Sequence, residues 1–536
     1  MRNLILCALV ASLFGCSKGE EAVTEFPCGV DQPAPYADGI PYLGIHANAQ
    51  NSDIVDCDTA PAYQEAWHVL KGKGIPQPVT FSPDGETVYA TSTNAEEDGC
   101  RVWALDAETG DTKWCENYAV DAAASSVEVD LDGHLYFTAA RRVISLNADG
   151  TERWSTMLEE GSLEVDVVTE AFGVHFTPDG HVATITAAGV VFLLDRATGA
   201  VLDSIDLPEA FGFVPLTSLG SGMDLVTGLP QSVKDDAVAI FGSIDSFQNV
   251  LETFLGAGGG FNDNTIAIAP NGTLYAVGGG PDPTRGSLMQ IKVQGTAAAP
   301  ELVAGWHLVT AGGSATSPSI SANGRFVHVS DGASAAGLID PSTSTSKNVV
   351  VDIAACDANT DGDADEAVCT ALWTEPLEKG AAAGSPGIFD DGSILFWEVS
   401  FNFAAIPPGV RDLVWKGPDG LVWDTVFPDD LEWTSVATTS RNHVFGTASV
   451  FTEAQGGESL AGLVPLPSTA ASELLVIDRD DGGIVFRAPI TDDATSTVAI
   501  GPKGSLYTAL YGLISILSVD QRPTLGLVKF VPTEAP

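Results

Sequence analysis

Short stretches of alternating apolar and polar residues recur along most of the chain, and tight turns join them in pairs. Residues 87–91 and 273–277 are clear examples of the alternation. The clearest turns are Asp84-Gly85, Asp132-Gly133, Asp179-Gly180, Asn271-Gly272, Asn323-Gly324 and Asp391-Gly392, and weaker ones are Ser221-Gly222, Asn442-His443 and Lys503-Gly504. Asp-Gly and Asn-Gly supply the positive φ angles that a tight β-hairpin needs. The pattern predicts an all-β protein made of repeated hairpins.

The spacing of these turns indicates a β-propeller. Most gaps are about 42 to 52 residues, the length of one four-stranded antiparallel blade. Nine turns exceed the usual ceiling of about eight blades, so one is expected to be false, and residues 211–260 are the most degraded unit. Residues 66–70 resemble the last strand of a blade and could pair with the C-terminal unit. We expect an eight-bladed propeller over residues 63–531, with seven blades as the alternative.

The second half of the repeat carries a recognisable phrase. Residues 104–114 read Ala-Leu-Asp-Ala-Glu-Thr-Gly-Asp-Thr-Lys-Trp, and weaker copies follow Asp149, Asp195, Asp419 and Asp478. The phrase resembles the repeat of pyrroloquinoline-quinone-type (PQQ-type) propellers. The glycine is expected to take a left-handed turn position, and the aromatic residue is expected to lie between neighbouring blades. The resemblance implies a fold rather than a cofactor.

Charge narrows the choice of partners. The chain has 24 Lys and Arg against 71 Asp and Glu, a net charge of -47, which would repel a phosphate backbone. We therefore expect no nucleic-acid partner. The 56 Gly and 31 Pro fit many tight turns, and no apolar run of 18 or more residues suggests a membrane-spanning helix.

The N-terminus reads as an export signal. Arg2 precedes an apolar run over residues 4–14, which is typical of a secretory signal peptide. The sequence Leu13-Phe14-Gly15-Cys16 resembles a bacterial lipobox, which implies lipidation of Cys16 after removal of residues 1–15. Ser17 implies sorting to the outer membrane, on its periplasmic or extracellular face. The alternative is a secreted protein with a stray thiol at Cys16. Residues 16–62 are expected to form a tether and an N-terminal cap.

The remaining six cysteines outside the signal peptide occur as neighbouring pairs. They are Cys28 with Cys57, Cys100 with Cys115, and Cys356 with Cys369. An exported protein meets an oxidising compartment, so three sequential disulfides are expected, although six cysteines allow 15 pairings. Buried free thiols are the alternative.

An acidic loop between the last two cysteines is a candidate calcium site. Its oxygen-bearing residues are Asp357, Asn359, Asp361, Asp363 and Asp365, and Gly362 allows a sharp turn. The loop resembles those of the EF-hand, dockerin and thrombospondin-repeat kinds, which implies a structural calcium ion. Val368 stands where an EF-hand would have its bidentate Glu. The alternative is an acidic, solvated insertion.

Enzyme motifs are missing from the sequence. There is no His-Glu-x-x-His, no Gly-x-Ser-x-Gly and no phosphate loop, and the eight histidines are scattered. These features favour a monomeric, noncatalytic scaffold that binds an envelope protein or polysaccharide, resembling the propeller lipoproteins of outer-membrane protein assembly. One alternative is a PQQ-dependent alcohol or sugar dehydrogenase, although the adjacent-cysteine pair of that family is missing. Another is a lyase or hydrolase acting on polysaccharides.

Overall fold

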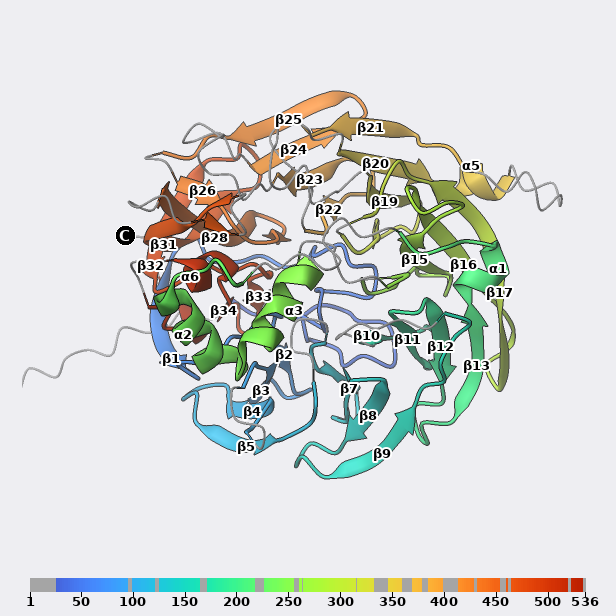
Figure 1. The fold of residues 1–536 in the computed structure, drawn as a ribbon, viewed down its shortest axis with the longest axis horizontal. Coiled ribbons are helices and arrows are strands. Elements are labelled where there is room, and N and C mark those ends of the chain that lie inside the picture. Colours follow the sequence, from blue (N-terminus) through green and yellow to red (C-terminus); the bar gives the residue numbers. More distant parts are fainter. Residues whose placement is uncertain are drawn as a thin grey trace, which may run out of the picture.

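The computed structural model describes residues 26–533 apart from internal gaps. The gaps are 95–98, 121–124, 164–170, 217–225, 255–259, 263, 315, 332–345, 359–368, 378–383, 399–412, 429–430, 454–458, 461–463 and 519–521. The described strands form a ring of eight antiparallel sheets around one axis (Figure 1). This confirms the eight-bladed propeller.

The first four blades each contain four strands. Blade 1 has β2 (Thr80–Phe81), β3 (Thr87–Thr91), β4 (Val102–Asp106) and β5 (Thr112–Glu116). Blade 2 has β6 (Glu128–Val129), β7 (Leu135–Ala139), β8 (Arg142–Leu146) and β9 (Glu152–Met157). Blade 3 has β10 (Ala171–Phe176), β11 (Val182–Thr186), β12 (Val190–Leu194) and β13 (Val201–Asp206). Blade 4 has β14 (Ala267–Ile268), β15 (Leu274–Gly279), β16 (Gly286–Thr296) and β17 (Ala299–Val309).

The other four blades complete the ring. Blade 5 has β18 (Ser319–Ile320), β19 (Phe326–Asp331), β20 (Lys347–Asp352) and β21 (Trp373–Pro376). Blade 6 has β22 (Gly387–Ile388), β23 (Ile394–Trp397), β24 (Leu413–Gly417) and β25 (Gly420–Thr425). Blade 7 has β26 (Leu431–Trp433), β27 (Thr438–Thr439), β28 (His443–Glu453), β31 (Pro467–Asp478) and β32 (Ile484–Ile490), and β29 (Ser459–Leu460) pairs with β30 (Val464–Pro465) nearby. Blade 8 has β33 (Ala499–Ile500), β34 (Leu506–Leu510) and β35 (Gly526–Pro532).

The last blade is closed by the beginning of the chain. Strand β1 (Tyr63–Val69) pairs antiparallel with β35, from Tyr63 opposite Pro532 to Val69 opposite Leu527. The predicted ring closure through residues 66–70 is therefore confirmed. Because closure gives the last sheet a full set of strands, the ring has no open gap between blades 8 and 1.

The repeat phrase forms the seams between blades, as predicted. Four outer-strand tryptophans lie against turn glycines of the following blade, in the pairs Trp67 with Gly110, Trp114 with Gly150, Trp154 with Gly199 and Trp423 with Gly482. All four glycines have φ between 73° and 86°, and a Cβ on any of them would meet the indole ring. The Trp114 indole also donates a hydrogen bond to the Ala148 carbonyl across its seam, at 2.8 Å. Glycine is thus needed both for the turn and for the close approach.

Helices occupy part of residues 211–260, where the most degraded of the turn units was expected. The connection from β13 to β14 contains α1 (Leu207–Phe211), α2 (Gln231–Phe241) and α3 (Ile244–Phe254). Two shorter helices, α5 (Ile353–Ala358) and α6 (Leu513–Leu517), lie in other connections. The turn predicted at Ser221-Gly222 falls outside the described residues, and the residues on either side of it form helices rather than a blade. None of the described helices is long and apolar enough to cross a membrane.

Two faces of the ring follow from the strand directions. The turn face carries the hairpins that join the first two strands of each blade, such as Asp84-Gly85 and Lys503-Gly504. The opposite, connection face carries the links that lead from one blade to the next. Helix α6 follows β34 and therefore lies on the connection face, and α2 packs against α6. Figure 1 shows α2 and α3 in front of the strands that they overlap.

Candidate functional site at the axis of the ring

The N-terminal residues before β1 cross the axis of the propeller. We call residues 26–60 the axial segment. Its backbone is hydrogen-bonded to the inner strands of several blades, since Ile268 N donates to Ala49 O at 2.7 Å and Ile320 N donates to Gln50 O at 2.8 Å. Val55 N donates to Thr439 O at 2.7 Å. The expected cap is therefore packed into the ring instead of lying over it.

The axial segment enters from the turn face. Cys28 N donates to Pro502 O at 3.0 Å, and Leu131 N donates to Pro35 O at 2.8 Å. Pro502 and Leu131 belong to hairpins on that face. The segment buries several large side chains against the ring, including Tyr36, Tyr42 and Leu43. The turn-face end of the axis is thus filled by the protein's own chain.

Asp53 is the centre of a buried polar network in the axial segment. It is 0% exposed and receives three contacts, from Tyr42 OH at 2.9 Å, from His46 Nδ1 at 2.7 Å and from Ala47 N at 3.0 Å. Tyr42 OH also contacts Thr497 of blade 8. Burial, followed by the negative charge of Asp53, raises the pKa of Tyr42 well above its usual value, so the phenol keeps its proton. Asp53 therefore holds the axial segment together through donors that it needs for its own burial, and Tyr42 links this network to the ring through Thr497.

A second carboxylate is buried at the boundary between blades 2 and 3. Glu128 Oε1 lies 2.5 Å from His175 Nδ1, and Tyr36 OH donates to Glu128 Oε2 at 3.3 Å. Burial raises the pKa of Glu128, and the nearby His175 opposes that change. A Cβ on Gly44 would meet the Glu128 carboxylate, so the axial segment approaches it closely. These residues come from two blades and the axial segment.

Asn51 fixes the tip of the axial segment between blades 4 and 5. It is 0% exposed, has φ of 57°, and its side-chain amide donates to Ile266 O and to Pro318 O, each at 3.1 Å. Asparagine tolerates positive φ better than most residues. One amide thus binds two neighbouring blades at once.

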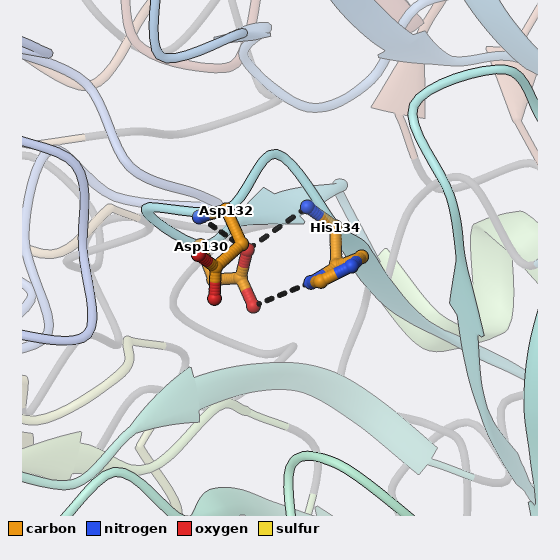
Figure 2. Close-up of side chains that lie close together, drawn as sticks. All are labelled: Asp130, Asp132 and His134. Atoms are coloured by element: carbon orange, nitrogen blue, oxygen red, sulfur yellow. Dashed lines mark hydrogen bonds and ion pairs between the residues drawn. The ribbon is translucent and has the colours of Figure 1, made fainter.

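A cluster of Asp130, Asp132 and His134 lies on the turn face of blade 2 (Figure 2). Each side chain offers one ligand atom and these atoms lie within 4.8 Å of one another, so the cluster could hold a metal ion. Asp130 already accepts hydrogen bonds from His134 N at 2.9 Å and from Tyr136 OH at 2.9 Å, and it forms an ion pair with Arg196 of blade 3 at 2.5 Å. Without a metal ion, these donors already account for the buried charge of Asp130.

Most of the predicted calcium loop falls outside the described residues. Asn359, Asp361, Asp363 and Asp365 belong to the gap at 359–368. Asp357 lies near the end of α5, where it accepts a hydrogen bond from Gln290 at 3.2 Å and lies 3.5 Å from Lys292. Calcium binding by the loop remains a prediction. The lipidation residue Cys16 also lies outside the described residues.

All three expected disulfides are formed in the structure. They join Cys28 to Cys57, Cys100 to Cys115 and Cys356 to Cys369. The first is important for the axis, because it links the two ends of the axial segment across 29 residues of sequence. The cap is therefore a covalently closed loop.

The sequence did not reveal the histidine–carboxylate contacts. In the sequence His46 and His175 stand alone, because no motif links them to their partners. Folding brings Asp53 next to His46 and Glu128 next to His175. One signal for Glu128 was available, since it stands between Val127 and Val129, just before the turn at Asp132-Gly133. A charge at that position requires a buried partner, but the sequence could not identify it.

Comparisons with known proteins show likeness in fold. No family model and no curated protein matches the chain. A quinohemoprotein alcohol dehydrogenase from Comamonas testosteroni has 12% identity and a TM-score of 0.55, over 94% of this chain and 82% of that chain. ADHIIG, a quinohemoprotein alcohol dehydrogenase from Pseudomonas putida HK5, has 13% identity and a TM-score of 0.54, over 96% and 84%.

A third similar structure is BamB from Moraxella catarrhalis. It has 12% identity and a TM-score of 0.46, over 88% of this chain and 100% of that chain. At these identities, likeness to solved structures shows the fold alone. The chain therefore has the propeller fold of PQQ-type proteins, as its repeat phrase indicated.

Proposed function

We propose that this protein is a lipid-anchored β-propeller of the outer membrane that acts as a noncatalytic binding or assembly scaffold. The observation that carries this proposal is the filled axis. A ring of blades can build a ligand site by gathering side chains from several blades at its axis. Here the axial segment takes that position, and Asn51, Tyr42 and the contact of Tyr36 with Glu128 hold it to the blades.

The chemistry of the axis supports a structural role for these groups. Asp53 has donors from Tyr42, His46 and the backbone, and Glu128 contacts His175 and Tyr36. A buried carboxylate in such a network would have to give up these partners to bind a substrate or ion. A rigid ring with a stabilised centre instead favours recognition through its outer surfaces and loops.

The first test concerns the cofactor. Purified protein is mixed with PQQ and calcium, and dye-linked oxidation of a panel of alcohols and sugars is measured. We expect neither stoichiometric binding nor turnover, because the axial groups are held by the protein's own chain. Cofactor binding with turnover would establish a dehydrogenase and overturn the scaffold role.

The second test concerns the anchor. We expect the mature protein to begin at Cys16 with a diacylglyceryl group, seen by mass spectrometry of the N-terminal peptide. Cys16→Ser should move the protein from the membrane fraction to the soluble fraction. A Cys16→Ser protein that stays with the membrane would contradict anchoring through this residue.

A further inference from the structure

The described chain begins on one particular face of the ring. Phe26 lies against the inner hairpin of blade 8, because a Cβ on Gly504 would meet Phe26 O and its Cβ. Two residues later, Cys28 N donates to Pro502 O at 3.0 Å in the same hairpin. Phe26 is partly buried against the large core cluster. The N-terminal end of the described chain is therefore fixed to the turn face, beside the innermost strands.

The length of chain before Phe26 limits where an anchor can lie. Cys16 is ten residues upstream, and a fully extended chain of ten residues spans at most about 35 Å. The turn face must therefore stay within that distance of a lipid on Cys16. This limit holds for any conformation of the intervening residues.

The connection face lies beyond the reach of such a tether. Strands of five or six residues plus a layer of helix give the ring a thickness of about 30 Å. Four strands per blade, about 4.8 Å apart, put the outermost strand about 15 Å from the innermost one. To bring α2 and α6 against the anchoring bilayer, the tether would have to pass around the rim, a path of about 45 Å on these dimensions, which is longer than the tether.

The charges of the turn face indicate which lipid surface it fits. Exposed carboxylates occur on its hairpins at Asp84, Glu86, Asp132, Asp179, Asp390 and Asp391, against the exposed cations Arg325, Arg441 and Lys503. Anionic lipids would repel this surface, and the repulsion would weaken with distance and salt. A zwitterionic lipid surface carries no such penalty.

We propose that the turn face is directed at the anchoring bilayer and fits a zwitterionic lipid surface, while the face with α2, α3 and α6 points away from it. This inference rests on the proposed lipid anchor. It deepens the scaffold role, because it assigns the helical face to partners approaching from the side away from the membrane.

The test compares one exposed site on each face of the full-length lipoprotein. Asn271→Cys lies on a turn-face hairpin and Ser232→Cys lies on α2, and both native side chains are exposed. Each variant is labelled with a donor dye and bound to phosphatidylcholine vesicles that carry a headgroup-linked acceptor. Energy transfer is expected to be about twofold or more greater from position 271, because the two faces are about 30 Å apart. Equal transfer, or greater transfer from position 232, would overturn the orientation.

Flotation with the vesicles separates this inference from the anchor itself. Cys16→Ser should remain at the bottom of the gradient, and the two labelled variants should float. If the labelled lipoprotein does not float, the anchor is wrong and the orientation falls with it. If it floats with equal transfer from both sites, the anchor stands and the orientation alone is wrong.

A second arm tests the lipid preference. Phosphatidylglycerol added to the vesicles should lower the transfer from position 271 at low salt, and added salt should restore it. An increase in transfer on adding phosphatidylglycerol would show attraction to anionic lipid and overturn the zwitterionic assignment.

Discussion

Two fully buried carboxylates, Asp53 in the axial segment and Asp493 on the connection face, differ in how many hydrogen-bond donors surround them. Asp53, in the axial segment, receives donors at both oxygens, from Tyr42, His46 and Ala47 N. Asp493, on the connection face, accepts at Oδ1 from Ser515 N at 2.9 Å and from Ser515 Oγ, and its Oδ2 has no hydrogen-bond partner among the described residues. Burial raises the pKa of Asp493 to about 6. The comparison shows that burial alone does not fix a carboxylate's role, because the number of donors decides whether its charge stabilises the fold.

The largest effect is expected where the donors are most numerous. Asp53→Ala should lower the free energy of unfolding by about 3–5 kcal/mol, because His46 and Tyr42 would lose their partner in a buried site. Urea unfolding followed by fluorescence measures the change. Asp38→Ala is the matched control, since Asp38 is exposed on the same segment and should change stability by less than about 0.5 kcal/mol. Equal effects of the two substitutions would contradict the role given to Asp53.

The next effect concerns the covalent closure of the axial segment. Replacing both Cys28 and Cys57 by Ser should cost about 3.5 kcal/mol on the chain-entropy model, for a loop of this size. Cleavage by protease should then appear within residues 28–57 before the blades are cut. The pair Cys100→Ser and Cys115→Ser is the control, because that disulfide lies within blade 1 and away from the axial segment. Cleavage that begins in the blades would count against a separable axial segment.

The smallest effect depends on pH and belongs to Asp493. Its folded pKa of about 6 is above the ordinary value of 3.8, so the folded state binds a proton more readily than the unfolded state. At neutral pH the charged Asp493 carboxylate therefore lowers the stability of the folded state. This destabilisation is lost as the pH falls through 6 and the carboxylate becomes protonated. Between pH 7.5 and pH 5 the relief is about 1.4 kcal/mol, one unit of pKa.

Asp493→Asn tests this sign directly. Asparagine can still accept from Ser515 N but carries no charge, so the variant should be more stable than the wild type at pH 7.5 and similar to it at pH 5. Asp235→Asn, at an exposed position on α2, is the control and should leave the pH dependence unchanged. A wild type that loses stability between pH 7.5 and pH 5 through this residue would contradict the raised pKa.

The local parts of the fold could be predicted from the sequence because they depend on near neighbours. Asp-Gly turns form within four residues, and the Trp114 phrase places its aromatic residue at a fixed distance from its own turn. These signals were enough to predict the number of blades and the aromatic contacts between neighbouring blades. The helices were missed because Ser221-Gly222 was interpreted as a hairpin. Val233, Ala237 and Ile240, which are buried on α2, follow a helical period that could have corrected this.

The contacts of the axial segment with the ring could not be predicted, because their partners are remote in sequence. The donors of Asp53 lie within 11 residues of it, but they belong to no recognisable motif. Tyr36 and Glu128 are 92 residues apart, and Asn51 and Pro318 are 267 residues apart. No local period or motif links such residues, and only the closed ring brings them together. Asp53 itself lies in a stretch without periodicity, where an isolated carboxylate usually indicates a solvated surface.

Closure of the ring by its own N-terminus also sets the order of folding. Strand β1 pairs only with β35, and Tyr42 meets Thr497 across 455 residues of sequence. Strand β1 can therefore pair with its neighbour only after β35, near the end of the sequence, has been synthesised. Contacts of such long range make folding slow. We therefore expect the completed ring to form late and in one concerted step, leaving the chain unclosed, and open to transport and to chaperones, until its synthesis is finished.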